Sequence, residues 1–209
     1  MITNLIYKYS LYTKVEATNT HTFSARIIHW GFILLYAYGI FKQLDDISEL
    51  ENSELLIFEV IFASIFLIIV IMRYSYMRRF ETFLGARESI PSAHKYLAKT
   101  IHISMYLCLI ILPLSGLLIA ALFTQGITDG AVQDLVIGIH GFSADLSYVL
   151  IAIHIGAALY SRIKGEGVWT SMVPIWKEHK SVTNKKIIKI KNLENKFFEK
   201  VEDFFSTPK

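Results

Sequence analysis

Four histidines lie within the apolar stretches of this 209-residue chain, and they are the residues best suited to chemistry. They are His29, His102, His140 and His154. An ionisable side chain inside hydrocarbon is costly, so it usually marks a functional position. One such histidine would often be only a hydrogen-bonded packing residue, whereas four favour a ligand role, since neutral imidazole is a common metal ligand. The remaining histidines, His21, His94 and His179, lie in polar segments, where we expect solvated side chains.

The spacing of His140 and His154 narrows the chemistry. On a helix, 14 residues bring the two side chains to within about 40° of the same face, roughly 21 Å apart along the axis. One imidazole near each membrane surface suits two stacked haems, each completed by a ligand from a neighbouring helix. Small residues nearby would let a flat macrocycle approach, or would simply permit tight helix packing; they are Gly31, Gly141, Gly156, Ala157 and Ala158.

The elements that must hold these histidines are four apolar runs. They cover about 26–42, 55–72, 97–123 and 136–160, in a chain that is 53% hydrophobic and only 19% charged. About 20 apolar residues cross roughly 30 Å of hydrocarbon. Backbone polar groups inside lipid must be satisfied within the segment, so the runs must be helices. The sequence therefore predicts an all-α membrane protein, a bundle of four transmembrane helices.

Loop charges predict how this bundle is oriented. Residues 43–54 and 124–134 carry aspartate and glutamate but no lysine or arginine, whereas residues 73–99 and the chain beyond 160 are rich in both. By the positive-inside rule, both termini are cytoplasmic and the two acidic loops face outward. Since residues 1–25 lack an apolar core followed by a cleavage site, we expect no cleavable signal peptide. The expected location is a bacterial inner membrane.

At the cytoplasmic side, two histidines compete as partner of His154. His29 lies one turn into the first run and His102 one turn into the third. Arg26 precedes His29 by three residues, so it projects from a similar helix face and could pair with a haem propionate.

The C-terminal tail divides into two parts. Residues 185–191 are basic with interleaved apolar residues, and residues 192–205 form an amphipathic helix capped by Asn192. Its apolar face comprises Leu193, Phe197, Val201, Phe204 and Phe205. Either the helix lies on anionic lipid, or it is a tail helix packed on cytoplasmic loops. At the other end, Tyr7, Tyr9 and Tyr12 predict a short interfacial segment.

Three motifs occur in a characteristic order: R-x-x-H-W at 26–30, I-H-x-x-x-Y-x-x-L-x-x-L-P-x-S-G at 101–116, and the histidine pair at 140 and 154. Together with MVP at 172–174, they resemble the prokaryotic cytochrome b561 family, which is related to the cytochrome b subunits of hydrogenases and formate dehydrogenases. The resemblance covers about residues 13–177.

This resemblance implies a set of haem b ligands. His29 and His154 would hold an inner haem, and His140 would hold an outer one. The outer partner in the family is a histidine early in the second helix, and the matching position here is Glu59. A carboxylate is a poor axial ligand for a low-spin haem, so the alternatives are a five-coordinate or glutamate-ligated outer haem, no outer haem, or an unexpected ligand. His102 matches a family position that lines the inner haem or a quinone pocket.

Three regions follow from these assignments. We expect an N-terminal cytoplasmic or interfacial segment at 1–25, a four-helix haem-binding membrane domain at 26–162, and a basic cytoplasmic tail with an amphipathic helix at 163–209. Its partners would be lipid and quinone, not nucleic acid.

Three functions remain to be weighed. The preferred hypothesis is electron transfer between membrane quinone and a redox partner at the outer face, such as a basic periplasmic cytochrome c. An alternative is a superoxide oxidase that reduces quinone, but acidic outer loops would repel the superoxide anion. A second alternative is a non-redox histidine-containing membrane protein or metal permease, because histidine pairs also bind transition metals.

Overall fold

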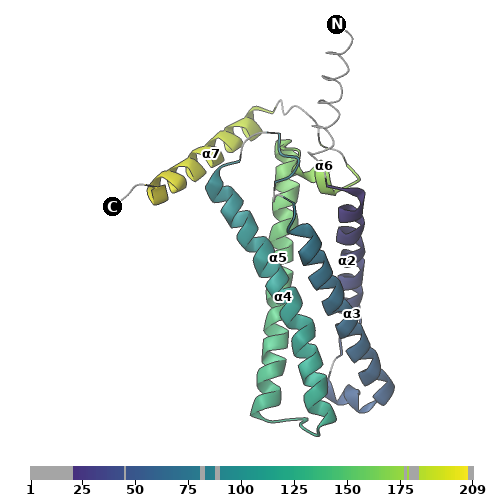
Figure 1. The fold of residues 1–209 in the computed structure, drawn as a ribbon. Coiled ribbons are helices and arrows are strands. Elements are labelled where there is room, and N and C mark those ends of the chain that lie inside the picture. Colours follow the sequence, from purple (N-terminus) through teal and green to yellow (C-terminus); the bar gives the residue numbers. More distant parts are fainter. Residues whose placement is uncertain are drawn as a thin grey trace. The chain divides into compact units, whose positions relative to one another are not determined.

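The computed structural model describes residues 21–44, 46–80, 83–87, 90–176, 178 and 184–206, and all regular structure in that part of the chain is helical (Figure 1). The elements are α2 (Phe23–Phe41), the 3₁₀ helix η1 (Ile47–Glu51), α3 (Ser53–Met77), α4 (Ser92–Thr124), α5 (Ala131–Lys164), α6 (Val168–Met172) and α7 (Lys185–Ser206). Four of these, α2 to α5, are long and apolar enough to cross a membrane. The predicted all-α fold with four spans is confirmed. The tyrosine segment near the N-terminus and His179 lie outside the described residues.

The helices begin at polar caps that the apolar runs do not include. Asn52 precedes α3, and its side chain accepts hydrogen bonds from the backbone N–H groups of Glu54 and Leu55. Asp46 caps η1 in a capping box, in which Glu49 accepts from the Asp46 backbone N–H at 3.0 Å. Such caps satisfy N–H groups that have no partner within the helix. Two acidic residues of the 43–54 loop therefore also order the entry to α3.

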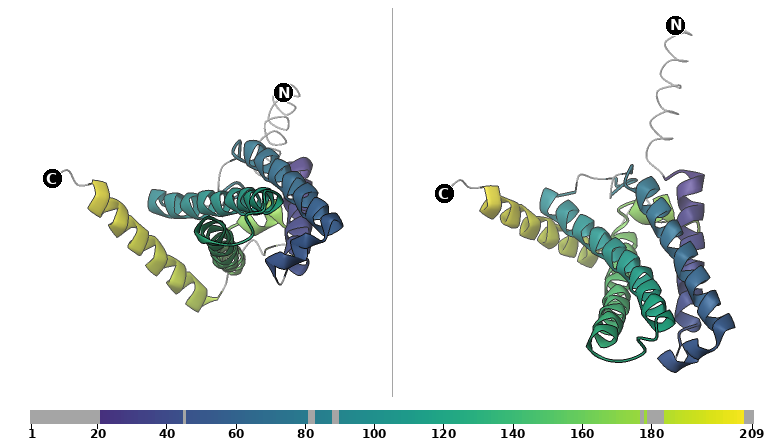
Figure 2. Two further views of the ribbon diagram at one scale, coloured as in Figure 1. Left: turned by 90° about the horizontal axis from the view of Figure 1, so that it is seen from below. Right: turned by 60° about the horizontal axis from the view of Figure 1, so that its bottom comes forward.

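Two compact units divide the chain, and the larger part of the four spans belongs to one of them. This membrane unit comprises Ile27–Arg79 and Ile101–Ile153. Within it α2 and α3 run side by side (Figures 1 and 2). Its core is formed by Phe32 of α2, Phe66 and Val70 of α3, and Leu109 of α4. These contacts hold α2, α3 and α4 together by burying apolar side chains against one another.

A polar contact adds α5 to the membrane unit. The hydroxyls of Tyr36 on α2 and Ser147 on α5 are hydrogen-bonded at 2.6 Å, and Ser147 is fully buried. A buried hydroxyl without such a partner would be costly. The pair therefore fixes the position of α5 against α2, which matters because α5 carries His140.

The other unit, the terminal unit, comprises Met1–Arg26, Phe80–Thr100 and His154–Lys209. Its helix α7 confirms that the tail is helical, but the predicted cap is wrong. The helix begins at Lys185, seven residues before Asn192, and the side chain of Asn184 accepts the Lys186 N–H at 2.9 Å. The basic run at 185–191 is thus the first part of the helix, because its alternating lysines and isoleucines fit a helix as well as a linker.

Contacts within the terminal unit attach α7 to the ends of α4 and α5. Glu194 receives hydrogen bonds from Lys164 at 2.8 and 3.0 Å and from the Tyr160 hydroxyl at 3.0 Å. Phe198 stacks on the His94 ring with a centroid separation of 4.7 Å. Other apolar residues of α7 stay exposed, namely Ile188, Ile190, Leu193, Phe197, Phe204 and Phe205. One side of α7 is therefore packed on the chain; whether the other side meets lipid stays a prediction.

The expectation that His21 and His94 are solvated is wrong. His21 is buried and contacts the Phe80 ring edge-on at 5.1 Å, and burial lowers its pKa, with Arg26 adding to the effect. His94 is half-buried beneath Phe198. Both residues follow polar sequence, but their aromatic neighbours lie far away along the chain.

Candidate functional site

His140 lies on α5 with its ring held in one orientation by α4. Its Nδ1 lies 3.0 Å from the hydroxyl oxygen of Ser115. The Ser115 hydroxyl donates to the carbonyl oxygens of Ile111 and Leu112, at 2.7 and 2.9 Å. A serine hydroxyl has one proton, so toward His140 its oxygen must accept. Nδ1 therefore carries the proton, and the Nε2 atom carries the lone pair.

The L-P-x-S-G motif explains this seat for the imidazole. Ser115 and Gly116 follow Pro113 inside α4, which continues unbroken to Thr124. A Cβ added at Gly116 would lie 3.4 Å from Cε1 of His140, at about van der Waals contact, so the ring packs directly against α4 at this glycine. Hydrogen bonding of one ring nitrogen to a neighbour is how proteins orient histidine ligands of metals.

Glu59, the residue at the position of the family's outer ligand, is engaged by a cation. Its Oε2 forms an ion pair with Nζ of Lys42, which follows α2 directly. The same ammonium group lies 4.3 Å from the ring centroid of Phe62, a cation–π contact. The other carboxylate oxygen, Oε1, is buried without a hydrogen-bond partner. Glu59 thus acts as the counterion of Lys42, a role that competes with ligation of a metal.

His29, on α2, contacts an arginine of α3. Nη2 of Arg73 lies 2.8 Å from Nδ1 of His29. A guanidinium group can only donate, so Nδ1 of His29 accepts, and a neutral ring then has its proton on Nε2. This is the opposite tautomer from that of His140.

The remaining predicted ligands are half-buried on their helices. His102 lies on α4 in the membrane unit, and His154 lies on α5 in the terminal unit. Arg26, on α2, has a buried Nε atom without an acceptor. Because His29 and His154 belong to different units, their pairing stays a prediction.

These residues fit a haem, with one adjustment. His140 presents the tautomer that iron ligation through Nε2 requires. His29 would adopt this tautomer only if Arg73 gave up its hydrogen bond to Nδ1. In the membrane unit, the Nε atom of Arg73 is buried without an acceptor, so it is able to donate to an anionic group such as a haem propionate; the same holds separately for Arg26 in the terminal unit. A Cβ added at Gly31 or Gly141 would meet no atom within 4 Å, so these glycines do not serve tight helix packing.

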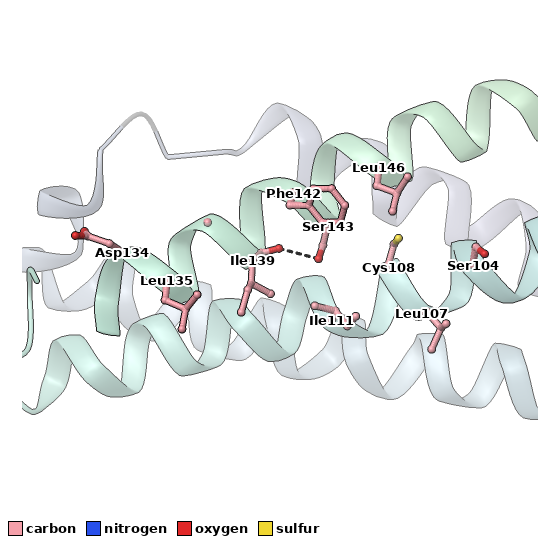
Figure 3. Close-up of a pocket in the computed structure, with 11 residues that line it drawn as sticks. Ser104, Leu107, Cys108, Ile111, Asp134, Leu135, Ile139, Phe142, Ser143 and Leu146 are labelled. Atoms are coloured by element: carbon pink, nitrogen blue, oxygen red, sulfur yellow. Dashed lines mark hydrogen bonds between the residues drawn. The ribbon is translucent and has the colours of Figure 1, made fainter. Parts of the chain in front are cut away.

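A groove of about 590 Å³ runs between α4 and α5 within the membrane unit, and Figure 3 shows the side chains that line it. None of the four histidines lines it. Exposed apolar residues dominate it, among them Leu107, Leu135 and Phe142. Ser143, one of its few polar residues, already donates to the Ile139 carbonyl at 2.7 Å. Such a lining suits contact with acyl chains of the bilayer.

A bare metal ion has no ligand cluster in the part of the chain that the structure describes. No group of three or more histidine, cysteine, aspartate or glutamate side chains placed to hold one occurs among the residues with a described position. The metal-permease alternative therefore gains no support from these residues.

Sequence reasoning missed three residues of the site: Lys42, Arg73 and Ser115. Arg73 was considered only as one of the basic residues after the second run, Lys42 only as the last residue of the first run, and Ser115 only as part of a motif. The available signals were an arginine directly after the apolar run 55–72 and a serine two residues after a proline within an apolar run.

The structure defines a multi-pass membrane protein with four apolar helices, three of which carry histidines, as a b-type cytochrome would require. The family comparison agrees: a match described as prokaryotic cytochrome b561 covers residues 20–174. The chain belongs to this family, whose members bind b-type haem, and it is a membrane b-type cytochrome of electron transfer. Searches of curated proteins and of solved structures found no match.

Proposed function

We propose that this cytochrome transfers electrons between membrane quinone and a redox partner at the outer face of a bacterial inner membrane. The observation that carries the proposal is the seat of His140, whose Nδ1–H group donates to Ser115. That bond leaves a lone pair on Nε2 and holds the ring against α4, as a metal ligand requires. When bound, haem b supplies reversible one-electron transfer.

The chain's own residues would hold haem at two positions, one nearer each surface of the membrane. His29 and His154 are the proposed ligands of an inner haem. His140 is the proposed ligand of an outer haem, and Glu59 is an unsuitable partner because Lys42 neutralises it. His102 is proposed to line the inner haem or a quinone pocket.

The proposed orientation, with both termini cytoplasmic, rests on the loop charges. In this orientation the acidic loop before α3 meets the outer aqueous phase. Asp46 in that loop is exposed, and its hydrogen bonds from Ser48 lower the pKa of its carboxyl. The carboxylate therefore stays ionised well below neutral pH. A negative outer face favours a basic partner such as a cytochrome c and disfavours the superoxide anion.

Purified protein tests the proposal in two steps. A reduced-minus-oxidised spectrum should contain a b-type band, and a soluble quinol should reduce the haem. Oxidation by a basic cytochrome c should slow as ionic strength rises, since screening weakens attraction between charged surfaces. Absence of the b-type band would refute the haem assignment. Quinone reduction by superoxide near the diffusion limit would instead favour the superoxide oxidase alternative.

The acidic loop offers a variant and a control. Replacing Glu49, Glu51 and Glu54 with glutamine should slow the reaction with cytochrome c and flatten its salt dependence. Replacing the exposed Glu199 of α7, on the proposed cytoplasmic side, should leave both unchanged. Equal effects of the two changes would refute the proposed orientation.

A further inference from the structure

Arg73 is a cation in an apolar setting. Its guanidinium carbon lies 4.6 Å from the ring centroid of Phe32 and 5.5 Å from that of Tyr106. The Nε atom is buried and has no acceptor. No ion pair of Arg73 with an aspartate or glutamate is formed within the described segments. Arg73 is half-buried, and a charge placed among aromatic rings in this way is costly unless an anion reaches it.

Its hydrogen bond to His29 does not solve this problem, since a neutral imidazole carries no charge. The same bond also keeps the Nδ1 atom of His29 as an acceptor. A neutral histidine that binds iron through Nε2 must carry its proton on Nδ1, where it cannot accept from a guanidinium. The present contact of Arg73 and ligation by His29 therefore exclude each other.

The two helix pairs of the membrane unit make the contrast plain. Ser115 on α4 accepts from Nδ1 of His140 on α5, and this selects the ligating tautomer. Arg73 on α3 donates to Nδ1 of His29 on α2, and this selects the other one. His140 already has the tautomer that ligation through Nε2 requires, whereas His29 acquires it only when Arg73 no longer donates to its Nδ1 atom.

We propose that Arg73 is an anion-binding residue that takes a haem propionate and, in moving to it, releases Nδ1 of His29 for the ligating tautomer. This inference rests on the proposed function, because it requires a haem at His29. Arginine suits the role, since its planar fork can hold a carboxylate with two parallel hydrogen bonds. Arg73 thus orients the His29 ring before haem binds and becomes the counterion of a propionate afterwards.

Binding of two porphyrins measures the contact directly. Full-length apoprotein in detergent is titrated with ferric protoporphyrin IX and with its dimethyl ester, in which both propionates are blocked. A His140→Ala background confines binding to the inner pair. We expect this protein to prefer the free acid on the order of 10- to 100-fold, the range for hydrogen bonds to a charged group.

Variants assign that preference to a residue. Arg73→Gln should lose most of it, while Arg73→Lys should keep part, because lysine retains the charge without the fork. Arg79→Gln is the matched control, since Arg79 is exposed and lies near the same end of α3, beyond its last turn. Circular dichroism of each variant shows that the helices are retained.

A second measurement follows the ring of His29 without any haem. In apoprotein labelled with ¹⁵N-histidine, the His29 tautomer should be Nε2–H, and Arg73→Gln should shift it toward Nδ1–H. Arg79→Gln should leave it unchanged.

The outcomes separate two failures. If the His140→Ala protein binds neither porphyrin, the proposed inner haem site fails, and the inference fails with it. If that protein binds haem and Arg73→Gln keeps the full preference for the free acid, only the inference is overturned. An unchanged His29 tautomer in Arg73→Gln apoprotein would also overturn it.

Discussion

Replacing Ser115 with alanine removes the acceptor that orients His140. Ser115 is only 6% exposed, so water cannot readily take its place. A buried donor left without a partner costs about 1–3 kcal/mol. At about 1.4 kcal/mol for each factor of ten, haem affinity at His140 should fall about 10- to 100-fold. The Leu112 backbone, which also hydrogen-bonds to the ring, would keep the loss toward the lower end of this range.

The assay is a haem titration of full-length protein in which His154→Ala confines binding to the His140 site. Ser143→Ala is the matched control, because Ser143 is similarly buried and also donates to a carbonyl of its own helix, that of Ile139. It should bind haem as its parent does. Equal affinities of the Ser115 and Ser143 variants would refute the role given to Ser115. Failure of the parent itself to bind haem would remove His140 from the ligands.

Three further variants test the other parts of the site and the tail. His29→Ala should lose the inner haem, seen as a smaller b-type band and less haem per chain, and an unchanged haem content would contradict the ligand assignment. Glu59→Gln should destabilise the protein by about 3–5 kcal/mol because Lys42 loses its counterion, whereas the double variant Glu59→Leu with Lys42→Met should recover most of this loss. Thermal unfolding in detergent measures both, and equal stability of the single variant and the wild type would contradict the pairing. Glu194→Gln should weaken the attachment of α7 to Lys164 and speed proteolysis of the tail; unchanged cleavage would show that this contact is dispensable.

The four spans were predictable because hydrocarbon imposes a length and an apolar composition that the sequence carries locally. The helices exceed the apolar runs at their ends: α4 begins at Ser92, not near 97, and α5 at Ala131, not near 136. Polar residues can continue a helix once it leaves the hydrocarbon, so hydropathy marks the span and not the helix. The wrong prediction that Asn192 caps the tail helix has the same origin, because the basic residues before it gave no sign that α7 starts at Lys185.

The histidines could be found from the sequence, whereas the atoms that orient them could not. Arg73 is 44 residues from His29, and Ser115 is 25 residues from His140. Such contacts depend on how helices face one another, which hydropathy does not encode. Glu59 marks a middle case: its departure from the family pattern was visible, but its partner Lys42 was not.

The hairpin of α4 and α5 has a use beyond this protein. The histidine proposed as a ligand, the serine hydrogen-bonded to it and the glycine against which its ring packs all lie between residues 115 and 140, on two helices joined by one short connection. The contacts that choose which nitrogen of His140 keeps its proton all come from this hairpin. For protein design, this pair of antiparallel helices is half of a ligand site that could be transferred to another protein. It supplies one imidazole in a fixed orientation, and the recipient protein would have to supply only the second ligand.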